Sequence, residues 1–600
     1  MKRTLIALLV LALAATSLAA AASQGGVTVP VAQEQSVQKA LNTMYTKAQL
    51  ASGKIYVGTD TCLSCHNFTR FPLTYHPTAL RRPMAMYTLQ PQKGVLANSL
   101  GGSQDDFIMG LDFNTKTGTP FDALKPNAPI LSYSAANDTY WIQLGPSGLK
   151  IQVVATWAGN TVGNGQRFIC RIPVSDIPTG SVGLYFAPLA WSGTGYSSNA
   201  SNWYNGNTPK YAPGLASSAL VPLQGQNWKA TCSGCHITGI KNVGTTAAGE
   251  MYTTPYPGVI IPKDSPNYPD LVGDGKGYLG GIGCESCHGP GSAHVAGGGD
   301  ITQIVNPNDI TNNQQRSWLC LQCHVQTGSY PTKKWGFTFD EVNNKPYIPS
   351  VPMEPLTNYQ VSKAVKWPDG IAYSTARIDS FYSSAHYQGS HGIACNDCHN
   401  AHRVTNNGSN QVRDSITRSG VKYTNTNIED NSFCMSCHHA PYFMGSYNIT
   451  AKDVQDWKAS GFEAPIPNKI RAAIEAHTHH PYGAANPDGS PRMLGQSRCI
   501  TCHMATSHTF WPSAPEDTIK FKDSSTSATV KGNINSCSAA CHRGQVISWS
   551  DVPANLTYTN NLYNTADELK LAGHLEQYFG PGGEWWDTSA AAKATKVQTK

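Results

Sequence analysis

Pairs of cysteines that are followed at once by a histidine recur along the chain. Seven of them have the spacing C-x-x-C-H, and an eighth has one more residue between its cysteines. Two thiols at this spacing can add to the two vinyl groups on one edge of a porphyrin, and the next imidazole then reaches the iron from one face. In chain order, motifs 1 to 8 are Cys62, Cys65 and His66; Cys232, Cys235 and His236; Cys284, Cys287 and His288; Cys320, Cys323 and His324; Cys395, Cys398 and His399; Cys434, Cys437 and His438; Cys499, Cys502 and His503; and Cys537, Cys541 and His542. The pattern predicts eight covalently bound haem c groups, with these histidines as ligands of the iron.

Three other uses of cysteine fit this pattern less well. Disulfides are the usual expectation for cysteines in an exported chain, but sixteen of the seventeen fall in the eight motifs. Zinc ribbons need no histidine after each pair, and thioredoxin-like motifs occur once per βαβ unit. Haem attachment is therefore the favoured interpretation for the seven regular motifs, and their context extends it to the eighth.

Eleven of the nineteen histidines lie outside the motifs and are candidates for the second axial position on each iron. Histidine is otherwise scarce, and nearly every spare one lies near a motif. The predicted second ligands are His76, His294, His386, His391, His402, His439, His477 and His508. His479 and His480 are weaker candidates, and His574 is left open between a ligand and a surface residue.

Local spacing indicates where some of these ligands lie. His294 and His402 follow their nearest motifs by six and three residues, so a short turn can carry each to an adjacent haem. From Asn468, a predicted N-cap, the isoleucines two and six residues on and then His477 fall on one face of a helix. This periodicity predicts that His477 turns inward with the apolar stripe.

The chain resembles the multihaem c-type cytochromes, and specifically an octahaem one. The motifs span residues 62–542, and the runs at 283–294 (GCESCHGPGSAH) and 499–510 (with CITCHM and SHTF) are similar to those of a broad superfamily. That superfamily comprises pentahaem nitrite reductases, hydroxylamine oxidoreductases and their electron-carrying relatives. The sparse motif spacing, the leader and the low charge resemble extracellular cytochromes of metal-reducing bacteria, including those that form filaments. The C-x-x-C-H-H arrangement that His439 completes resembles one found in the small tetrahaem cytochromes, where neighbouring imidazoles point to two different haems.

The resemblance implies two functions of different classes. If every iron has two imidazole ligands, it is closed to substrate, and the protein is an electron carrier rather than an enzyme. The rival is an oxidoreductase that acts on a small nitrogen or sulfur compound at one open haem. In the nitrite reductases the catalytic motif commonly has lysine in place of histidine, and none of the eight motifs here has that substitution.

A long interval without haem motifs separates motif 1 from motif 2. The turn residues from Gly145 to Gly148 lie between two strand-like runs of this interval. They predict that these two runs form a hairpin. We expect a small β-rich domain in which Cys170 is a buried, unpaired thiol. The runs with the β-branched and aromatic residues typical of strands are 140–144, 149–154, 167–172 and 184–189.

Elsewhere regular structure should be sparse, because porphyrins would supply the apolar cores. The predicted fold class is a multihaem cytochrome c: mostly coil and short α-helices wrapped around eight haems, with a small β-rich domain near the N-terminal side. The expected segments are a signal peptide (1–22), an N-terminal segment with haem 1 (23–90), the β-rich haem-free domain (91–228), haems 2 to 5 (229–425), haems 6 to 8 (426–545) and a C-terminal tail with one helix (546–600).

The leader and the composition limit where the protein is expected to be located and which partners it is expected to have. Lys2 and Arg3 precede the apolar run from Leu5 to Ala15 and then small residues, which are the three parts of a secretory signal peptide. The run is shorter than a bilayer span, so we expect no membrane span in the mature chain. Charged residues are 14% of the chain and the formal net charge is +6, which excludes a nucleic-acid binder that depends on bulk charge.

Together these features predict an exported octahaem c-type cytochrome, extracellular or periplasmic, that carries electrons through closely packed haems. The expected partners are redox proteins or extracellular electron acceptors. Self-association into filaments would let subunits continue the chain of haems. The oxidoreductase with one open haem is the alternative.

Overall fold

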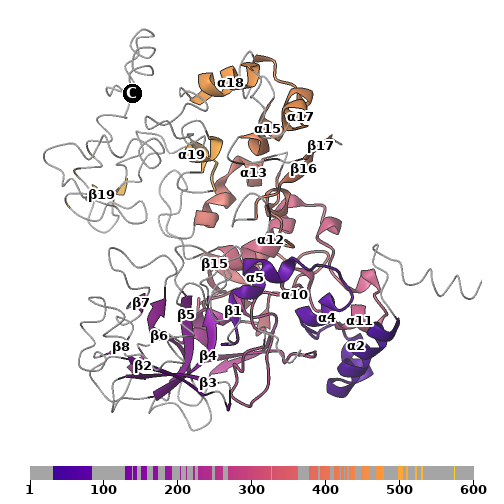
Figure 1. The fold of residues 1–600 in the computed structure, drawn as a ribbon, viewed down its shortest axis with the longest axis vertical. Coiled ribbons are helices and arrows are strands. Elements are labelled where there is room, and N and C mark those ends of the chain that lie inside the picture. The colour runs from indigo at the N-terminus through magenta and orange to yellow at the C-terminus, as the bar shows by residue number, and fades with distance from the viewer. Residues whose placement is uncertain are drawn as a thin grey trace, which may run out of the picture. The chain divides into compact units, whose positions relative to one another are not determined.

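A computed structural model describes the chain as two compact units (Figure 1). Unit 1 comprises residues 1–311, 328–361 and 401–403, and unit 2 comprises 312–327, 362–400 and 404–600. The residues described are 31–83, 129–134, 136–137, 139–144, 150–157, 166–172, 183–191, 203–204, 211–212, 221–222, 227–245, 251–260, 268–325, 327–362, 377–389, 392–403, 405, 411–418, 421–424, 426, 428, 431–439, 447–459, 468–478, 498–504, 508–510, 521–522, 529–531, 566, 570 and 573. The predicted signal peptide, motif 8 and nearly all of the predicted tail lie outside them.

A seven-stranded antiparallel sheet is the largest element of unit 1 (Figure 1). Six strands follow one another in chain order from β2 to β7, and β1 pairs with β4. Neighbours in sequence that are also neighbours in space need no crossover connection, which is typical of antiparallel sheets. The strands are β1 (Leu80–Arg81), β2 (Pro129–Ser134), β3 (Thr139–Leu144), β4 (Lys150–Trp157), β5 (Gln166–Ile172), β6 (Gly183–Trp191) and β7 (Trp203–Tyr204).

The strand predictions for this region are confirmed. The four predicted runs are β3, β4, β5 and β6. β3 and β4 pair antiparallel, with Tyr140 opposite Val153, as predicted for a hairpin whose turn lies outside the described residues. Cys170 is completely buried in β5 as a free thiol, also as predicted.

Outside the sheet, unit 1 consists of short helices and two-stranded ribbons. The helices are α2 (Val31–Met44), α3 (Lys47–Ala51), α4 (Thr59–Leu63), α5 (Tyr75–Thr78), α8 (Trp228–Thr231), α9 (Ser233–His236), α10 (Glu285–His288) and α11 (Ser292–Ala296), with 3₁₀ turns at Phe71–Leu73, Ile301–Gln303, Pro307–Asp309 and Leu356–Asn358. The ribbons pair β8 (Tyr211–Ala212) with β9 (Val221–Pro222), β10 (Ile240–Thr245) with β11 (Met251–Pro255), β12 (Thr327–Ser329) with β15 (Gln360–Ser362), and β13 (Phe339–Asp340) with β14 (Lys345–Pro346). All these helices except α2 have four or five residues, which agrees with the predicted short helices.

The core of the sheet also positions motif 2. Ile169 of β5 and Leu184 of β6 are completely buried and pack with Trp228, the first residue of α8. Cys232, which follows α8, packs against the same cluster. The sheet, which the sequence predicts to carry no haem motif, therefore forms one wall around the first thiol of motif 2.

Unit 2 is built from short helices around a small apolar core. Met435 of motif 6 and Ile470 have no exposed surface in this core, and Trp457 is also buried there. The helices are α12 (Asn313–His324), α13 (Ala385–Gln388), α14 (Cys395–Cys398), α15 (Ser432–His438), α17 (Ala451–Ala459), α18 (Asn468–Thr478) and α19 (Cys499–His503), with a 3₁₀ segment at Arg377–Ser383. The ribbons pair β16 (Ser415–Arg418) with β17 (Val421–Thr424) and β18 (Phe521–Lys522) with β19 (Thr529–Lys531).

The helix predicted from Asn468 onward is α18, with two differences. The helix includes Asn468 as its first residue, so Asn468 is not the residue before the helix. Ile470 and Ile474 are buried as predicted. His477, however, is exposed, and the prediction that it turns inward with the apolar stripe is wrong. The reason is its position one residue before the helix end, beyond Ile474, which is the last residue of this helix in the apolar core.

Among the described helices, none combines the length and apolarity needed to cross a bilayer. The six predicted segments stay a prediction, since the two units are compact groupings of the chain and do not test those boundaries.

Candidate haem sites

A single turn brings the first cysteine and the histidine of a motif together. In motifs 1, 3 and 5 the backbone N–H of the histidine donates to the carbonyl of the first cysteine, at 2.8, 3.0 and 2.9 Å. All fourteen cysteines of motifs 1 to 7 are free thiols with partly exposed surfaces. This arrangement leaves both thiols able to react with one porphyrin edge.

Four pairs of imidazoles that lie close together in the described part of the chain bear on ligation. Each pair contains one motif histidine and one histidine predicted as a second ligand. Three pairs have nearly parallel rings: His66 and His294 (centres 6.2 Å apart, planes at 20°), His288 and His402 (6.0 Å, 23°), and His503 and His477 (6.0 Å, 9°). The fourth pair, His438 and His386, has centres 5.7 Å apart and planes at 71°.

These separations are those that one metal between two imidazoles would impose. A metal–imidazole bond is about 2 Å long and the ring centre lies about 1 Å further on, so two rings on opposite sides of one metal have centres about 6 Å apart. The angle between the ring planes is free, because each ring can rotate about its bond to the metal. The parallel pairs and the crossed pair therefore both fit a haem iron with two axial histidines.

Hydrogen bonds at Nδ1 leave the other ring nitrogen of several histidines available. A carbonyl oxygen only accepts, so Nδ1 carries the proton in each bond and Nε2 keeps its lone pair for a metal. The bonds run from His288 to Val305 (2.7 Å), from His294 to Asp300 (2.9 Å), from His439 to Met435 (3.0 Å) and from His503 to Phe510 (2.9 Å). Motif histidines and predicted second ligands are thus oriented in the same way, by a hydrogen bond from Nδ1 to a backbone carbonyl.

Burial and neighbouring imidazoles keep four of these rings neutral. Desolvation is the main cause that lowers the pKa of His66, His288 and His438, and nearby histidines lower it further. The same causes lower the pKa of His386 to about 4. Since a metal binds only the neutral imidazole, these environments favour the ligating form.

For other predicted ligands the structure shows contacts of a different kind. The backbone carbonyl of His76 accepts from the N–H of Ile282 at 3.0 Å. That of His236 accepts from the N–H of Gly281, the residue before Ile282, also at 3.0 Å. The ring of His236 lies edge-on to Trp157 of the sheet, with centres 5.2 Å apart. Of the remaining predicted ligands, His508 lies 5.8 Å from the ring of Phe510.

Some of the predicted site falls outside the described residues. This applies to His391 among the second ligands, and to Cys537, Cys541 and His542 of motif 8. Within the described chain, no three His, Cys, Asp or Glu side chains converge on a common metal position. The convergence there is pairwise, imidazole with imidazole.

Sequence reasoning missed three polar residues that connect one motif to another. Glu285 and Asp397 lie between the two cysteines of motifs 3 and 5, and Asn431 directly precedes the helix of motif 6. Their position within or beside a motif is visible in the sequence. Their partners are not, because they lie 68 to 228 residues away along the chain.

Comparisons with known proteins add one distant likeness. No family model and no curated protein matches the chain. The structure is similar to an undecaheme cytochrome from the S-layer of Carboxydothermus ferrireducens, with 17% sequence identity, a TM-score of 0.30, and 77% of this chain and 53% of that chain covered. The chain thus spans about half the length of that cytochrome. A TM-score of 0.30 does not define a shared fold, so the assignment of haem depends on the cysteine and histidine geometry.

Proposed function

We propose that this protein is an exported octahaem c-type cytochrome that transfers electrons between irons which each have two histidine ligands. The observation that carries the proposal is the set of three imidazole pairs with centres 6.0 to 6.2 Å apart, each joining a motif histidine to a distant histidine. Unrelated surface histidines have no reason to meet at one common separation. Haem, when bound, supplies reversible one-electron chemistry at its iron.

The four imidazole pairs favour specific ligand assignments. His66 with His294 would hold haem 1, His288 with His402 haem 3, His438 with His386 haem 6, and His503 with His477 haem 7. The exposure of His477 is consistent with this role, because an imidazole that would hold a haem must leave a ring nitrogen accessible to the iron. The backbone positions of His76 and His236 favour this pair for haem 2. His391, His439 and His508 stay candidates for the other irons.

Two axial imidazoles favour electron transfer over catalysis. An iron with two protein ligands has no open position, so the chain's own side chains would exclude a substrate there. Chemistry at a small nitrogen or sulfur compound would need one iron without its second histidine. The proposal therefore predicts low-spin iron at every site, with the open-haem oxidoreductase as the alternative.

Location and partners follow from the leader and from the function. An exported chain with low charge suits periplasmic or extracellular respiration, with redox proteins or extracellular electron acceptors as partners. Assembly into filaments would extend the haem chain between subunits. Electron microscopy of concentrated holoprotein tests assembly, and discrete particles alone would contradict it.

Mass spectrometry and electron paramagnetic resonance test the proposed function. The intact mass of the secreted protein should exceed that of the processed polypeptide by eight haems. The ferric protein should show low-spin signals. A mass without haem would refute the assignment, and a substantial high-spin signal would favour the oxidoreductase.

A matched pair of variants tests the ligand assignment. His477→Ala should convert one ferric haem to high spin and let one reduced haem bind carbon monoxide, because His503 would lose its opposite ligand. His480→Ala, three residues further along, should leave the spectra unchanged, since it has no assigned role. Equal spectra for the two variants would contradict the pairing of His477 with His503.

A further inference from the structure

We propose that Glu285, Asp397 and Asn431 are positioning residues that fix the spacing between neighbouring haems. They link motif 3 to motif 1, motif 5 to motif 4, and motif 6 to motif 7. Electrons would then pass within the pairs 1–3, 4–5 and 6–7 and not simply in the order of the motifs along the chain. This inference rests on the proposed haem function and deepens it.

Glu285 makes the first link, between motifs 3 and 1. It lies between the two cysteines of motif 3 and has no exposed surface. Its carboxylate accepts hydrogen bonds from the backbone N–H groups of Val57 (2.9 and 3.0 Å), Gly58 (2.7 Å) and Gly291 (2.7 Å). Gly58 directly precedes α4, the helix that carries Cys62. One side chain therefore binds the start of motif 1 and the turn that leads to α11.

A row of aromatic rings shows independently that motifs 1 and 3 are neighbours in unit 1. The pair His294 and His66 continues to Phe68, whose ring centre lies 6.2 Å from that of His66. Phe68 in turn stacks on His402 at 4.9 Å, and His402 pairs with His288 at 6.0 Å. The proposed ligands of haems 1 and 3 thus form one continuous row, with Phe68 between them.

Phe68 also has the exposure expected of a side chain beside a porphyrin. Its ring is 43% exposed, although it is a large apolar residue in the middle of a packed row. Together with Glu285, it indicates that motifs 1 and 3 are held at close range by packing through Phe68 and by hydrogen bonds through Glu285.

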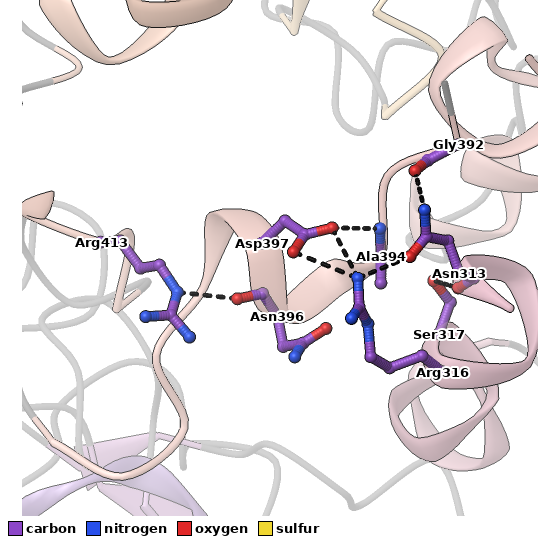
Figure 2. Close-up of polar contacts among 8 residues, drawn as sticks. All are labelled: Asn313, Arg316, Ser317, Gly392, Ala394, Asn396, Asp397 and Arg413. Atoms are coloured by element: carbon purple, nitrogen blue, oxygen red, sulfur yellow. Dashed lines mark hydrogen bonds and ion pairs between the residues drawn. The ribbon is translucent and has the colours of Figure 1, made fainter. Parts of the chain in front are cut away.

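Asp397 makes the second link, between motifs 5 and 4 (Figure 2). It lies in α14, and both its oxygens accept from one guanidinium nitrogen of Arg316, at 3.2 and 3.0 Å. Arg316 is in α12, four residues before the first cysteine of motif 4. The same carboxylate accepts from the N–H of Ala394 at 2.8 Å, which fixes the start of α14.

A second contact reinforces the attachment of α14 to α12 (Figure 2). Asn313, the first residue of α12, donates from its side-chain amide to the carbonyl of Gly392. Its amide oxygen accepts from Arg316 at 2.6 Å. Helix α12, which carries motif 4, is therefore tied both to α14 and to the segment just before it, by side chains that also contact each other.

Asn431 makes the third link, between motifs 6 and 7. It directly precedes α15, has no exposed surface, and its side-chain oxygen accepts from the backbone N–H of Cys499 at 2.8 Å. Its φ of 67° lies in the left-handed region, which asparagine tolerates better than most residues. The backbone of Cys499, the first cysteine of motif 7, is thereby held at the start of the helix of motif 6.

An aromatic contact supports the proximity of motifs 6 and 7. The ring of Phe510 lies 4.3 Å from that of His386, the proposed second ligand of haem 6. The carbonyl of the same residue accepts from Nδ1 of His503 at 2.9 Å. A residue that orients the ligand of one proposed haem thus packs on the ligand of the next.

The test measures coupling between haems in the intact holoprotein. Circular dichroism in the Soret band reports coupling between closely spaced porphyrins, and a potentiometric titration reports the potentials of the haems. We expect Glu285→Ala to lose part of the Soret couplet and to shift potentials, with Glu285→Gln restoring part of both through its amide oxygen. Arg316→Met, at a half-exposed link, should alter the same readouts in a variant that still folds.

Two acidic residues outside the motifs provide matched controls. Glu341 in unit 1 accepts from Thr332 and Lys334, and Asp453 in unit 2 accepts from Thr450 and pairs with Lys469. Glu341→Ala and Asp453→Ala should leave the Soret couplet and the potentials unchanged.

The outcomes separate failure of the links from failure of the function. A full complement of eight haems in every variant, with unchanged couplets and potentials in the link variants, would overturn the positioning role and leave the cytochrome assignment intact. Changes of equal size in the controls would also overturn it. Absence of haem in the unsubstituted protein would refute the proposed function itself.

Discussion

Glu285 and Asp397 occupy comparable places inside their motifs and contrasting surroundings. Glu285 has no exposed surface and binds only uncharged backbone N–H groups. The side chain of Asp397 is 38% exposed and faces the guanidinium of Arg316, whose side chain is 17% exposed. The comparison teaches that a link between motifs can be built without a countercharge where several amides converge, and with an ion pair where water reaches.

The two solutions differ in what their loss would cost. A buried acceptor that satisfies several N–H groups leaves all of them without partners when it is removed, which is expensive in the interior. A partly exposed ion pair is screened by solvent and contributes at most about 1 kcal/mol. We therefore expect the Glu285 link to dominate stability and the Asp397 link to be the weaker one.

Replacement of Glu285 by alanine should have the largest effect. It leaves the N–H groups of Val57, Gly58 and Gly291 without their carboxylate acceptor, and each unsatisfied buried group costs about 1–3 kcal/mol. The free energy of unfolding of unit 1 should fall by on the order of 3–5 kcal/mol. Denaturant titration of the holoprotein, followed in the Soret band, measures this loss.

Glu341→Ala is the control for that measurement. Glu341 also accepts several hydrogen bonds in unit 1, from Ser329, Thr332 and Lys334, but those with Thr332 and Lys334 are exposed. Water can replace it there, so the loss should stay below about 1.5 kcal/mol. Equal losses for the two variants would show that burial of Glu285 is not what distinguishes its link.

The stability contribution of Glu285 should also depend on pH. Burial raises its pKa from 4.5 to about 7, although its backbone hydrogen bonds lower it. Between these values the native state binds a proton that the unfolded chain has lost, so the free energy of unfolding falls as pH rises, by at most about 3 kcal/mol, and levels off above pH 7. The titratable groups around it are Tyr45, Tyr56, Tyr256, Cys62 and Cys284.

Comparison with Glu285→Gln isolates this pH dependence from that of all other groups. The unfolding free energy of the unsubstituted protein minus that of Glu285→Gln should decrease from pH 5 to pH 7.5. A difference that stays constant over this interval would contradict the raised pKa of Glu285.

Asn431 offers an intermediate case, a buried neutral link. Asn431→Ala removes the acceptor for the N–H of Cys499 and places alanine at a φ of 67°, so unfolding of unit 2 should cost about 2 kcal/mol less. Asn431→Asp keeps an acceptor oxygen and tolerates this φ, and should lose less than alanine does. Denaturant titrations of both variants test this order, and the reverse order would exclude the hydrogen bond as the cause.

Much of the fold was within reach of sequence reasoning because its signals are local. Runs of residues typical of strands predicted β3 to β6, and the isoleucine spacing predicted α18 with Ile470 and Ile474 buried. The inward turn of His477 failed for a local reason as well. Periodicity fixes a direction around the helix axis, but it does not say where packing along that axis stops.

In the candidate site, too, local sequence reveals some features and not those that depend on contacts distant in the chain. The attachment motifs are visible because their residues are consecutive, and His294 and His402 lie close after a motif. The identity of each imidazole pair was not predictable, because His66 and His294 are brought together by contacts far apart in the chain. The same applies to the links: Glu285 bonds to Val57 across 228 residues, which no local pattern encodes.

Arg316→Met should have the smallest effect and the clearest dependence on salt. The variant keeps an unbranched but shorter side chain. It removes both the charge opposite Asp397, which still accepts from the N–H of Ala394, and the donor to the amide oxygen of Asn313. The expected loss for unit 2 is about 0.5–1 kcal/mol at low ionic strength, because the pair is partly exposed. The part of this loss that comes from the ion pair should vanish near 1 M salt, where charges are screened within about 3 Å, whereas the part that comes from the hydrogen bond to Asn313 should remain. Glu285→Ala, measured in the same two buffers, should lose equally in both, since its partners carry no charge. A loss that is wholly independent of salt would mean that the guanidinium acts through its hydrogen bond to Asn313 or through packing in α12 and not through its charge, and the contrast between the two links would then be one of burial alone.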